Sequence, residues 1–425
     1  MIPLIEAQAF VLDACPPSSP CRVPLDEALG HVAAESVLAA EPVPPFVNSS
    51  MDGYAVRSAE TDGAGTGRRA VRLEVVGTIM AGKPLAAPVG PGQSARIMTG
   101  APLPAGADAV CMLEEVRTER DGATVVIERT VEAGDFVRHT GQDVDVGDTV
   151  LAEGSLLTPA RIGVLASQGL TEVLVYPTPR IGVLSTGDEL VSGSGPLPPG
   201  KIRDANRHTL LALVRREGWE PVDLGICGDD EEALVDVLDR ARNRCDAVVT
   251  SGGVSVGDLD VVKLVLRKRS AGTMRWMQVA IRPAKPFAFG LLDGTGIPVF
   301  GLPGNPVSAM VSFELFVRPA GLRMGGHGKL DRPSVTAIAD SDLSRRPDGK
   351  THFLRSVASV DDHGVFHVHP LSGQESHQLS AMADANGLAI LPDGDGVGAG
   401  GRVRVMLIDP GALAVPGSMS PAVPT

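Results

Sequence analysis

The chain has 425 residues, of which 43% are apolar and 21% charged, a composition typical of a globular protein with roughly two to four domains. The 38 Lys and Arg against 51 Asp and Glu give a net charge of −13, which argues against a nucleic-acid partner. The five cysteines are scattered without a Cys-x-x-Cys pair, so we expect neither a zinc cage nor a disulfide framework. The sequence contains no long apolar run and no signal-peptide pattern, and we therefore expect a cytoplasmic protein with no membrane partner.

The N-terminal segment has two stretches with the apolar spacing of a helix, at Ile5–Leu12 and Leu25–Leu38, which predict two packed helices. Closely spaced prolines at 42–45 then favour an extended connector. A polar turn at 48–53, which includes Asp52, precedes a short strand-like run at Tyr54–Val56. An ordinary structural turn would explain this segment equally well.

The segment from Val71 to Val150 is predicted to be rich in strands, at 71–77, 94–98, 107–113 and 123–128. Residues 77–84 nearly match the Walker A loop, but Pro84 has no hydroxyl for magnesium, which excludes a P-loop NTPase. Two further loops are rich in donors and charges, one with Thr99 and one with Asp143. Either loop is also compatible with an ordinary β-turn.

Residues 151–175 return to a helical pattern, and two prolines at 177 and 179 mark a domain boundary. Strand-like and helix-like runs then alternate, which predicts a mostly parallel sheet covered by helices on both faces. Ligands of such sheets bind beyond the carboxyl ends of the strands. The expected strands are 180–184, 222–226, 247–250, 277–281, 287–291 and 297–301, and the expected helices are 206–217, 231–242 and 261–269.

The stretch that follows the strand at 247–250 carries the strongest chemical signal. Its glycines, among them Gly252 and Gly253, let backbone N–H groups approach an anion, and Ser255 adds a hydroxyl. Asp258 and Asp260 come directly afterwards, so the pattern predicts a phosphate and metal corner. The alternative is a tight strand-to-helix turn with a solvated acidic cap.

The other strand ends add polar side chains of both signs. Thr186 and Glu189 follow the first strand, Asp229 follows the second or caps the next helix, and the segment 282–286 holds Arg282 and Lys285 between prolines. Asn305 is expected as the N-cap of a helix that begins at Pro306. The carboxylates can bind a hard cation, and the basic groups can bind oxyanions. Together they indicate phosphoryl or oxyanion chemistry at this edge.

A second β-rich segment follows Arg332, and its most notable polar residues are Arg355, Ser376 and His377. A His-x-His pair at 367 and 369 lacks a nearby third ligand and more simply reflects one face of a strand. The last residues, 411–425, are rich in Pro, Ala and Ser and are expected to be disordered.

Several motifs together resemble one family. VNSSMDGYAV, AGKP, RIMTGAPLPAGADAV, GQDVDVGD, VLSTGDEL, TSGGVSVGD, RPAKPFAFG and GLPGNPVSAMVSFE occur in the order and at the intervals of the molybdopterin molybdenumtransferases, called MoeA in bacteria and related to the gephyrin E domain. The resemblance runs from about residue 2 to residue 408 and implies an L-shaped homodimer of multidomain α/β and β subunits. The implied parts are a helical and extended dimerisation domain (1–45 with 144–177), a small β-rich domain (46–143), an α/β molybdopterin-binding domain (178–328) and a C-terminal β-barrel domain (329–410).

The resemblance also implies a reaction. Molybdate, as substrate, would be inserted into adenylylated molybdopterin with Mg²⁺ as cofactor, which gives molybdenum cofactor and releases AMP. Other proteins of the same biosynthesis would be further partners. Carried over by motif, the catalytic positions are Asp52, Glu189, Asp229, Asp260 and Lys285. The binding positions are Thr99, Asp143, Thr186, Gly252, Gly253, Ser255, Arg282, Pro286, Arg355 and Ser376, and the candidate metal ligands are Asp229, Asp258 and Asp260.

In the family, Asp52 and Thr99 belong to a β domain that faces the α/β domain of the partner subunit, so the resemblance implies a composite dimer site. The sequence departs from the family pattern at three positions. Arg282 stands where lysine is frequent, Ala284 replaces a usual glycine, and Ala205 replaces a frequent serine. An arginine still binds an oxyanion, but its planar fork differs from an ammonium group.

Three alternatives stay open. Residues 253–257 fit the Gly-x-Ser-x-Gly elbow of α/β hydrolases with Ser255 as nucleophile, although Asp258 and Asp260 would repel the negative charge of acyl transfer. A paralogue that inserts tungstate is not distinguished, because the two oxyanions have nearly the same size and charge. A protein that only binds or scaffolds molybdopterin is the third alternative.

Overall fold

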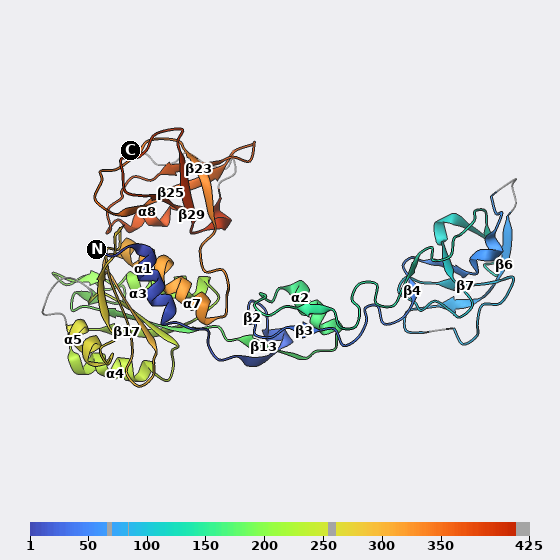
Figure 1. Cartoon of the computed structure of the whole chain (residues 1–425), viewed down its shortest axis with the longest axis horizontal. Coiled ribbons are helices and arrows are strands. Elements are labelled where there is room, and N and C mark those ends of the chain that lie inside the picture. Colours follow the sequence, from blue (N-terminus) through green and yellow to red (C-terminus); the bar gives the residue numbers. More distant parts are fainter. Residues whose placement is uncertain (66–69, 84, 254–260, 414–425) are drawn as a thin grey trace.

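The computed structural model describes residues 1–65, 70–83, 85–253 and 261–413. The chain is elongated: a small β module lies at one end, a slender linker module follows, and an α/β domain with a C-terminal barrel beside it forms the other end (Figure 1). Within the described residues, no helix combines the length and apolar character that a membrane crossing requires. The multidomain α/β and β architecture expected from the sequence is confirmed.

The linker module is built from short strands. β1 (Cys21–Pro24), β13 (Glu172–Tyr176) and β2 (Val32–Ala33) form one sheet, and β3 (Val37–Leu38) pairs with β12 (Thr149–Leu151). Helix α2 (Pro159–Ser167) packs next to them, and Thr158 caps it by accepting from the backbone N–H of Arg161. The predicted helix at 151–175 is therefore shorter than expected, and its last part is strand β13.

The predicted helix at Leu25–Leu38 is wrong. The segment forms only a 3₁₀ turn, η1 (Leu25–Glu27), before the short strands β2 and β3. Gly30 adopts a φ of +81°, which ends any helix there. The apolar side chains that gave the helical spacing still become buried, because Leu25, Ala28 and Ala33 pack against Leu151 and Leu165. Tertiary packing thus buries these apolar side chains without forming the helix that their spacing predicted.

The β module confirms the strands predicted between 54 and 128. Its six-stranded sheet has the order β8-β5-β7-β6-β10-β9. The strands are β5 (Gly53–Val56), β6 (Val71–Ile79), β7 (Gln93–Ile97), β8 (Ala109–Met112), β9 (Val116–Glu119) and β10 (Thr124–Ile127). Two short strands, β4 (Asn48–Ser49) and β11 (Val137–Arg138), pair where the chain enters and leaves the module.

The α/β domain contains a six-stranded sheet of order β17-β14-β18-β22-β21-β19. Four strands run parallel: β17 (Glu220–Cys227), β14 (Arg180–Thr186), β18 (Ala247–Ser251) and β22 (Pro298–Leu302). The next two, β21 (Pro286–Leu291) and β19 (Arg275–Gln278), each run antiparallel to the neighbour before them. The mostly parallel sheet is confirmed.

Helices cover both faces of this sheet. One apolar cluster joins the sheet to α1 (Leu4–Asp13), α3 (Asn206–Arg216), α6 (Pro306–Ser312) and α7 (Arg318–Met324), and π-helix η5 (Phe313–Val317) connects the last two. A second cluster joins the other face to α4 (Glu231–Ala241) and α5 (Val261–Lys268). Helix α1 thus packs on the α/β domain, where Phe10 meets Phe289 edge-on at 5.7 Å between ring centroids, and not in the linker module. The domain boundaries given above stay predictions.

The strand directions bring the loops with polar residues to one edge. Because β19 runs in the same direction as the four parallel strands, the segment between β19 and β21 lies at their carboxyl edge. That segment carries Arg282, Lys285 and Pro286. It lies at the same edge as the loops after β14, β17, β18 and β22, as the sequence predicted.

The C-terminal barrel closes with five strands. β25 (Thr351–Val360), β26 (Phe366–Pro370), β23 (Ser334–Ala339), β29 (Arg402–Leu407) and β27 (Gly387–Leu391) follow one another, and β27 pairs back onto β25. A sixth strand, β20 (Ile281–Arg282), comes from the α/β domain and pairs with β25. This strand attaches the barrel directly to the carboxyl edge of the α/β sheet.

Buried ion pairs hold the segment between α7 and β23 against the α/β domain. Arg332 donates to Glu314 at 2.7 Å, and Arg318 donates to Glu217 at 2.8 Å. Arg318 also donates to the carbonyl of Leu330 at 3.0 Å. All four charged side chains are at most one tenth exposed. The connection to the barrel is therefore fixed by charge pairing as well as by strand β20.

Candidate functional site

A cavity of about 320 Å³ lies between the carboxyl edge of the α/β sheet and the barrel. Three segments line it: 281–286 between β19 and β21, the loop after β22 with the start of α6, and residues 374–376 of the barrel. Four residues predicted from the sequence meet here, namely Arg282, Lys285, Pro286 and Ser376, and Lys350 adds a further positive charge.

The two walls of this cavity are joined by hydrogen bonds. Asn305 donates from Nδ2 to Ser376 Oγ at 3.0 Å, and the backbone N–H of Val307 donates to the carbonyl of Ser376 at 3.2 Å. Asn305 is the residue before α6, as predicted, but its side chain makes no capping bond. Its amide serves the contact with the barrel instead, and it orients the Ser376 hydroxyl.

Arg282 is exposed and has a weak ion-pair partner. Its Nη2 lies 3.5 Å from Glu375 Oε1, and both side chains are more than half exposed. An exposed ion pair of this kind contributes little, on the order of 0–1 kcal/mol, so an incoming oxyanion can displace it. Next to it, Ala284 adopts a φ of +75°, a conformation that glycine adopts without strain and other residues rarely adopt.

Arg355 is a buried cation. Its side chain is fully buried, and Nη2 donates to the carbonyls of Gly373 at 2.5 Å and Glu375 at 3.3 Å. Among the described residues, Nε and Nη1 have no hydrogen-bond partner. Burial lowers the pKa of Arg355, which the charge of Glu375 offsets in part. A buried charge with unused donors is costly, and an anion close to it would lower that cost.

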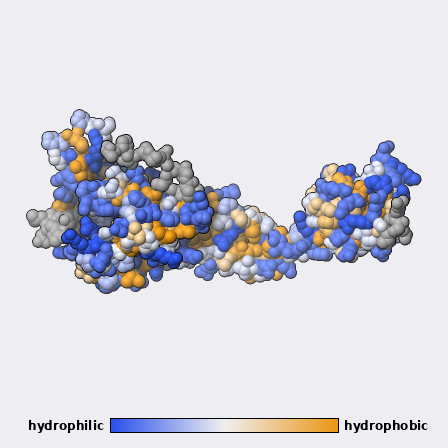
Figure 2. Space-filling view, turned by 90° about the horizontal axis from the view of Figure 1, so that it is seen from above, coloured by the Kyte–Doolittle hydropathy of each residue, from blue (hydrophilic) through white to orange (hydrophobic). Residues whose placement is uncertain are grey.

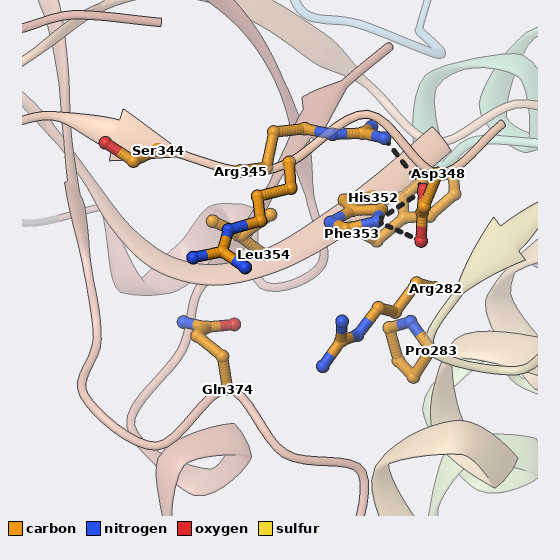
Figure 3. Close-up of a pocket in the computed structure, with 10 residues that line it drawn as sticks. Arg282, Pro283, Ser344, Arg345, Asp348, His352, Phe353, Leu354 and Gln374 are labelled. Atoms are coloured by element: carbon orange, nitrogen blue, oxygen red, sulfur yellow. Dashed lines mark hydrogen bonds and ion pairs between the residues drawn. The ribbon is translucent and has the colours of Figure 1, made fainter. Parts of the chain in front are cut away.

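A second cavity, of about 330 Å³, adjoins the first and shares Arg282, Pro283 and Gln374 with it (Figure 3). Asp348 lies in its wall, 2.9 Å from Arg345 Nη2 and 3.2 Å from His352 Nε2. Hydrogen bonds, first from Lys350 and then from His352, lower the pKa of Asp348 to about 2. Arg282 thus borders two cavities with several positive charges around it.

The glycine loop after β18 lies at the same edge. Gly252 and Gly253 have φ values of +102° and +71°. A Cβ on Gly252 would lie 2.7 Å from the carbonyl oxygen of Thr186. The Thr186 hydroxyl donates to the carbonyl of Ser251 at 3.3 Å. Only glycine fits at this position, because its backbone lies so close to that of Thr186, and the close approach to a ligand stays a prediction. Ser255, Asp258 and Asp260 lie outside the described residues.

The carboxylates after β14 and β17 are exposed at this edge. Asp188 Oδ1 accepts from the backbone N–H of Asp229 at 3.0 Å, and Glu189 follows Asp188. Asp230, and not Asp229, caps α4 by accepting from the N–H of Ala233 at 2.9 Å. Within the part of the chain that the structure describes, no three His, Cys, Asp or Glu side chains form a metal cluster. Two of the three predicted metal ligands lie outside that part.

Asp52 and Thr99 meet each other in the β module. Asp52 Oδ1 accepts from the backbone N–H of Thr99 at 2.7 Å and from its hydroxyl at 2.9 Å, and these bonds lower the pKa of Asp52. Asp143 is exposed on the returning connector, where its N–H donates to Val43 at 2.9 Å. Figure 1 shows the β module far from the α/β domain, so one chain does not bring these residues to the cavity.

Sequence reasoning missed several residues of the site, among them Lys350, Gln374 and Asn206. Gln374 behaves like a strand partner, because its amide accepts from the N–H of Arg355 at 3.0 Å and donates to the carbonyl of Arg355 at 2.9 Å. Asn206 contacts two loops of the carboxyl edge. Gln374 left no signal in the sequence, whereas Asn206 lies in the Asp-Ala-Asn segment already noted for Ala205.

Comparison with known proteins covers nearly the whole chain. Residues 2–169 match the MoeA N-terminal region (domain I and II), 182–322 match a probable molybdopterin binding domain, and 336–408 match the MoeA C-terminal region (domain IV). The chain is 38% identical to a molybdopterin molybdenumtransferase of Haemophilus influenzae over 95% of this chain and 98% of the relative. It is 40% identical to molybdopterin molybdenumtransferase 2 of Mycobacterium tuberculosis over 91% of this chain and 95% of the relative.

A solved structure has the same fold over the same length. The molybdopterin biosynthesis MoeA protein of Pyrococcus horikoshii is 29% identical, covers 96% of this chain and 100% of its own, and has a TM-score of 0.79. The three domain matches, the two relatives and this structure all indicate the same family. The chain therefore belongs to the molybdopterin molybdenumtransferase (MoeA) family and is a transferase of molybdenum cofactor biosynthesis.

Proposed function

We propose that the protein inserts molybdate into adenylylated molybdopterin in a Mg²⁺-dependent reaction that releases AMP. The observation that carries this proposal is the cavity in which Arg282 and Lys285 lie beside the loop held by the buried Arg355. Three positive charges line this small space, on Arg282, Lys285 and Lys350, and they suit a tetrahedral dianion because charge-assisted hydrogen bonds are the strong ones. The curated relatives named molybdopterin molybdenumtransferase support molybdate as that dianion.

Each group of residues at the cavity has a separate role in this proposal. Arg282 and Lys285 attract and hold molybdate, and Ser376, whose oxygen accepts from Asn305, keeps its own hydroxyl proton to donate to an oxyanion. The backbone at Gly252 and Gly253 receives the phosphates of the adenylylated pterin. Mg²⁺, when bound, neutralises charge on those phosphates. Asp229, with Asp258 or Asp260, would hold it through oxygen ligands, which magnesium prefers.

We assign the complete site to a homodimer, because the second group of residues carried over by motif belongs to the β module. Asp52 and Thr99 lie far from the cavity of their own chain (Figure 1), so a partner subunit's β module would supply them. Figure 2 shows apolar surface on the linker module between the two ends of the molecule. Leu29, Leu38 and Val146 of this module are each about 60% exposed. A second copy that covers them would bring the two halves of the site together.

The oxyanion part of the proposal is tested by equilibrium binding of molybdate to the full-length protein. Wild type is expected to bind, and Lys285→Ala is expected to weaken binding by about tenfold or more, because a charge-assisted hydrogen bond contributes about 1.5–3 kcal/mol. Lys329→Ala, which removes an exposed lysine outside the cavity, is the matched control and should bind like wild type. Equal binding by Lys285→Ala and wild type would contradict the assignment of this cavity.

A further inference from the structure

Asn206 joins two loops at the carboxyl edge of the α/β sheet. It is the first residue of α3, and its Nδ2 donates to Ser251 Oγ at 2.6 Å and to the carbonyl oxygen of Gly304 at 2.7 Å. Ser251 ends β18, and Gly304 lies in the loop after β22. A carbonyl oxygen can only accept, so the amide nitrogen and not the amide oxygen must face Gly304. One NH₂ group thus uses both of its hydrogens on two separate loops.

Within residues 251–253 and 303–305, which the structure describes, few other contacts hold the spacing of the two loops. Gly252 follows Ser251, and a Cβ placed on Gly304 would meet only the Cα of Gly252, at 4.0 Å. One backbone bond, from the N–H of Gly252 to the carbonyl of Leu302 at 3.1 Å, precedes this gap. Glycines lose more conformational freedom on ordering than other residues, so a loop that contains them benefits most from an added restraint.

The start of α3, which carries Asn206, is itself held in place by hydrogen bonds. Asp204 is 5% exposed and accepts from Ser185 Oγ at 2.9 Å and from Arg207 Nε at 3.0 Å. Ser185 belongs to β14, the strand next to β18. The start of α3 is therefore fastened to one strand, and Asn206 reaches from that fixed point to the ends of the next two.

We propose that Asn206 is a positioning residue for phosphate binding: it fixes the spacing between residues 251–253 and the loop at Gly304. This inference rests on the proposed function, in which the backbone at Gly252 and Gly253 receives the phosphates of the adenylylated pterin. Removal of the contact leaves the chemistry intact but lowers the fraction of molecules whose loops are ready to bind. The apparent affinity falls in proportion to that fraction.

The first test compares Asn206→Ala, Asn206→Asp and His208→Ala in the full-length protein. His208 lies two residues further along α3, is exposed, and is the matched control. The KM for adenylylated molybdopterin should rise about tenfold in Asn206→Ala, and more in Asn206→Asp, whose carboxylate would oppose the Gly304 carbonyl. The kcat should stay near the wild-type value in all three. An unchanged KM, or a fall in kcat alone, would overturn the proposal.

A second measurement does not depend on turnover. Backbone hydrogen exchange at 251–253 and 303–305 should accelerate in Asn206→Ala and stay unchanged in His208→Ala, while the rest of the sheet keeps its protection. Ser251→Ala should add little to Asn206→Ala, because both changes remove the same contact. Unchanged exchange at both loops would refute the positioning role even if the wild type showed no turnover at all. If the wild type showed no turnover but the variants gave the expected exchange pattern, the proposed reaction would be refuted and the positioning role would stand.

Discussion

Arg282 and His352 are partners in the parallel pairing of β20 with β25. Arg282 thus lies in the α/β part of the sequence, but its backbone pairs with a strand of the barrel. Ile281 pairs with Thr351 in the same ladder. Because strand pairing ties two backbones together by hydrogen bonds, the barrel helps to set where Arg282 lies. The barrel thus takes part in the site through Arg282 as well as through Ser376 and Arg355.

Arg355→Met tests whether the buried arginine is held for an anion. Arg355 has no carboxylate partner within ion-pair distance among the described residues, so its loss should change the free energy of unfolding by less than about 1.5 kcal/mol. Arg332→Met is the control: it breaks a buried pair with Glu314 and should cost about 3–5 kcal/mol. Chemical denaturation measures both. Molybdate should stabilise wild type and not Arg355→Met. The assignment fails if molybdate stabilises the two equally.

Gly252→Ala tests the close approach at the glycine loop. The new Cβ would meet the Thr186 carbonyl at 2.7 Å at a φ of +102°, so stability should fall by about 3 kcal/mol or more. Gly200→Ala has a similar strain at +76° but no atom within 4 Å, and it should cost only about 1–2 kcal/mol. Thermal unfolding compares the two variants. Equal losses would show that the Gly252 loop has room for a side chain.

Asp348 predicts an acid-sensitive contact beside the second cavity. Its pKa is lowered from 3.8 to about 2, chiefly by the hydrogen bond from Lys350 at 2.6 Å. A lowered carboxyl pKa stabilises the fold above the unfolded value, so this contribution should be lost as pH falls from about 4 to about 2. Asp348→Asn should flatten the pH dependence of Tm in that window. Asp331→Asn, which removes an exposed carboxylate outside this contact, should leave it unchanged, and an identical pH dependence in both variants would contradict the prediction.

Mixed dimers test the composite site. Asp52→Ala and Lys285→Ala are each expected to be inactive, since each damages every site of its own homodimer. After the two proteins are mixed and allowed to exchange subunits, about a quarter of the wild-type rate should return, because half of the dimers are mixed and one of two sites in each is intact. Absence of any recovery, with exchange verified, would place both residues in a site within one chain.

The sequence predicted the parts of the fold that depend on local pattern. The alternation of strands and helices between 180 and 302 was enough to place Glu189, Asp229, Gly252 and Arg282 at one edge, since the carboxyl ends of parallel strands meet there. It did not predict that the helical spacing at Leu25–Leu38 would be satisfied by short strands, because Gly30 and tertiary packing outweighed the pattern.

Other features depend on contacts between distant segments, and no local pattern reports them. Strand β20 is two residues long and exists only through its pairing with β25. The burial of Arg355 and the two-loop contact of Asn206 likewise follow from packing across the domain boundary and across the sheet. The separation of Asp52 from the cavity was expected only through the resemblance to the family, since spacing along the chain does not reveal it.

Release of AMP from adenylylated molybdopterin, measured with Mg²⁺ in the presence and absence of molybdate, tests the central claim most directly. Wild type should release AMP only when molybdate is present, and both Asp260→Ala and Lys285→Ala should lower the rate by at least about a hundredfold, since each removes a charge from the reacting centre. Lys329→Ala should react like wild type. Failure of a folded, dimeric wild-type protein to release AMP, or release that ignores molybdate, would contradict the account.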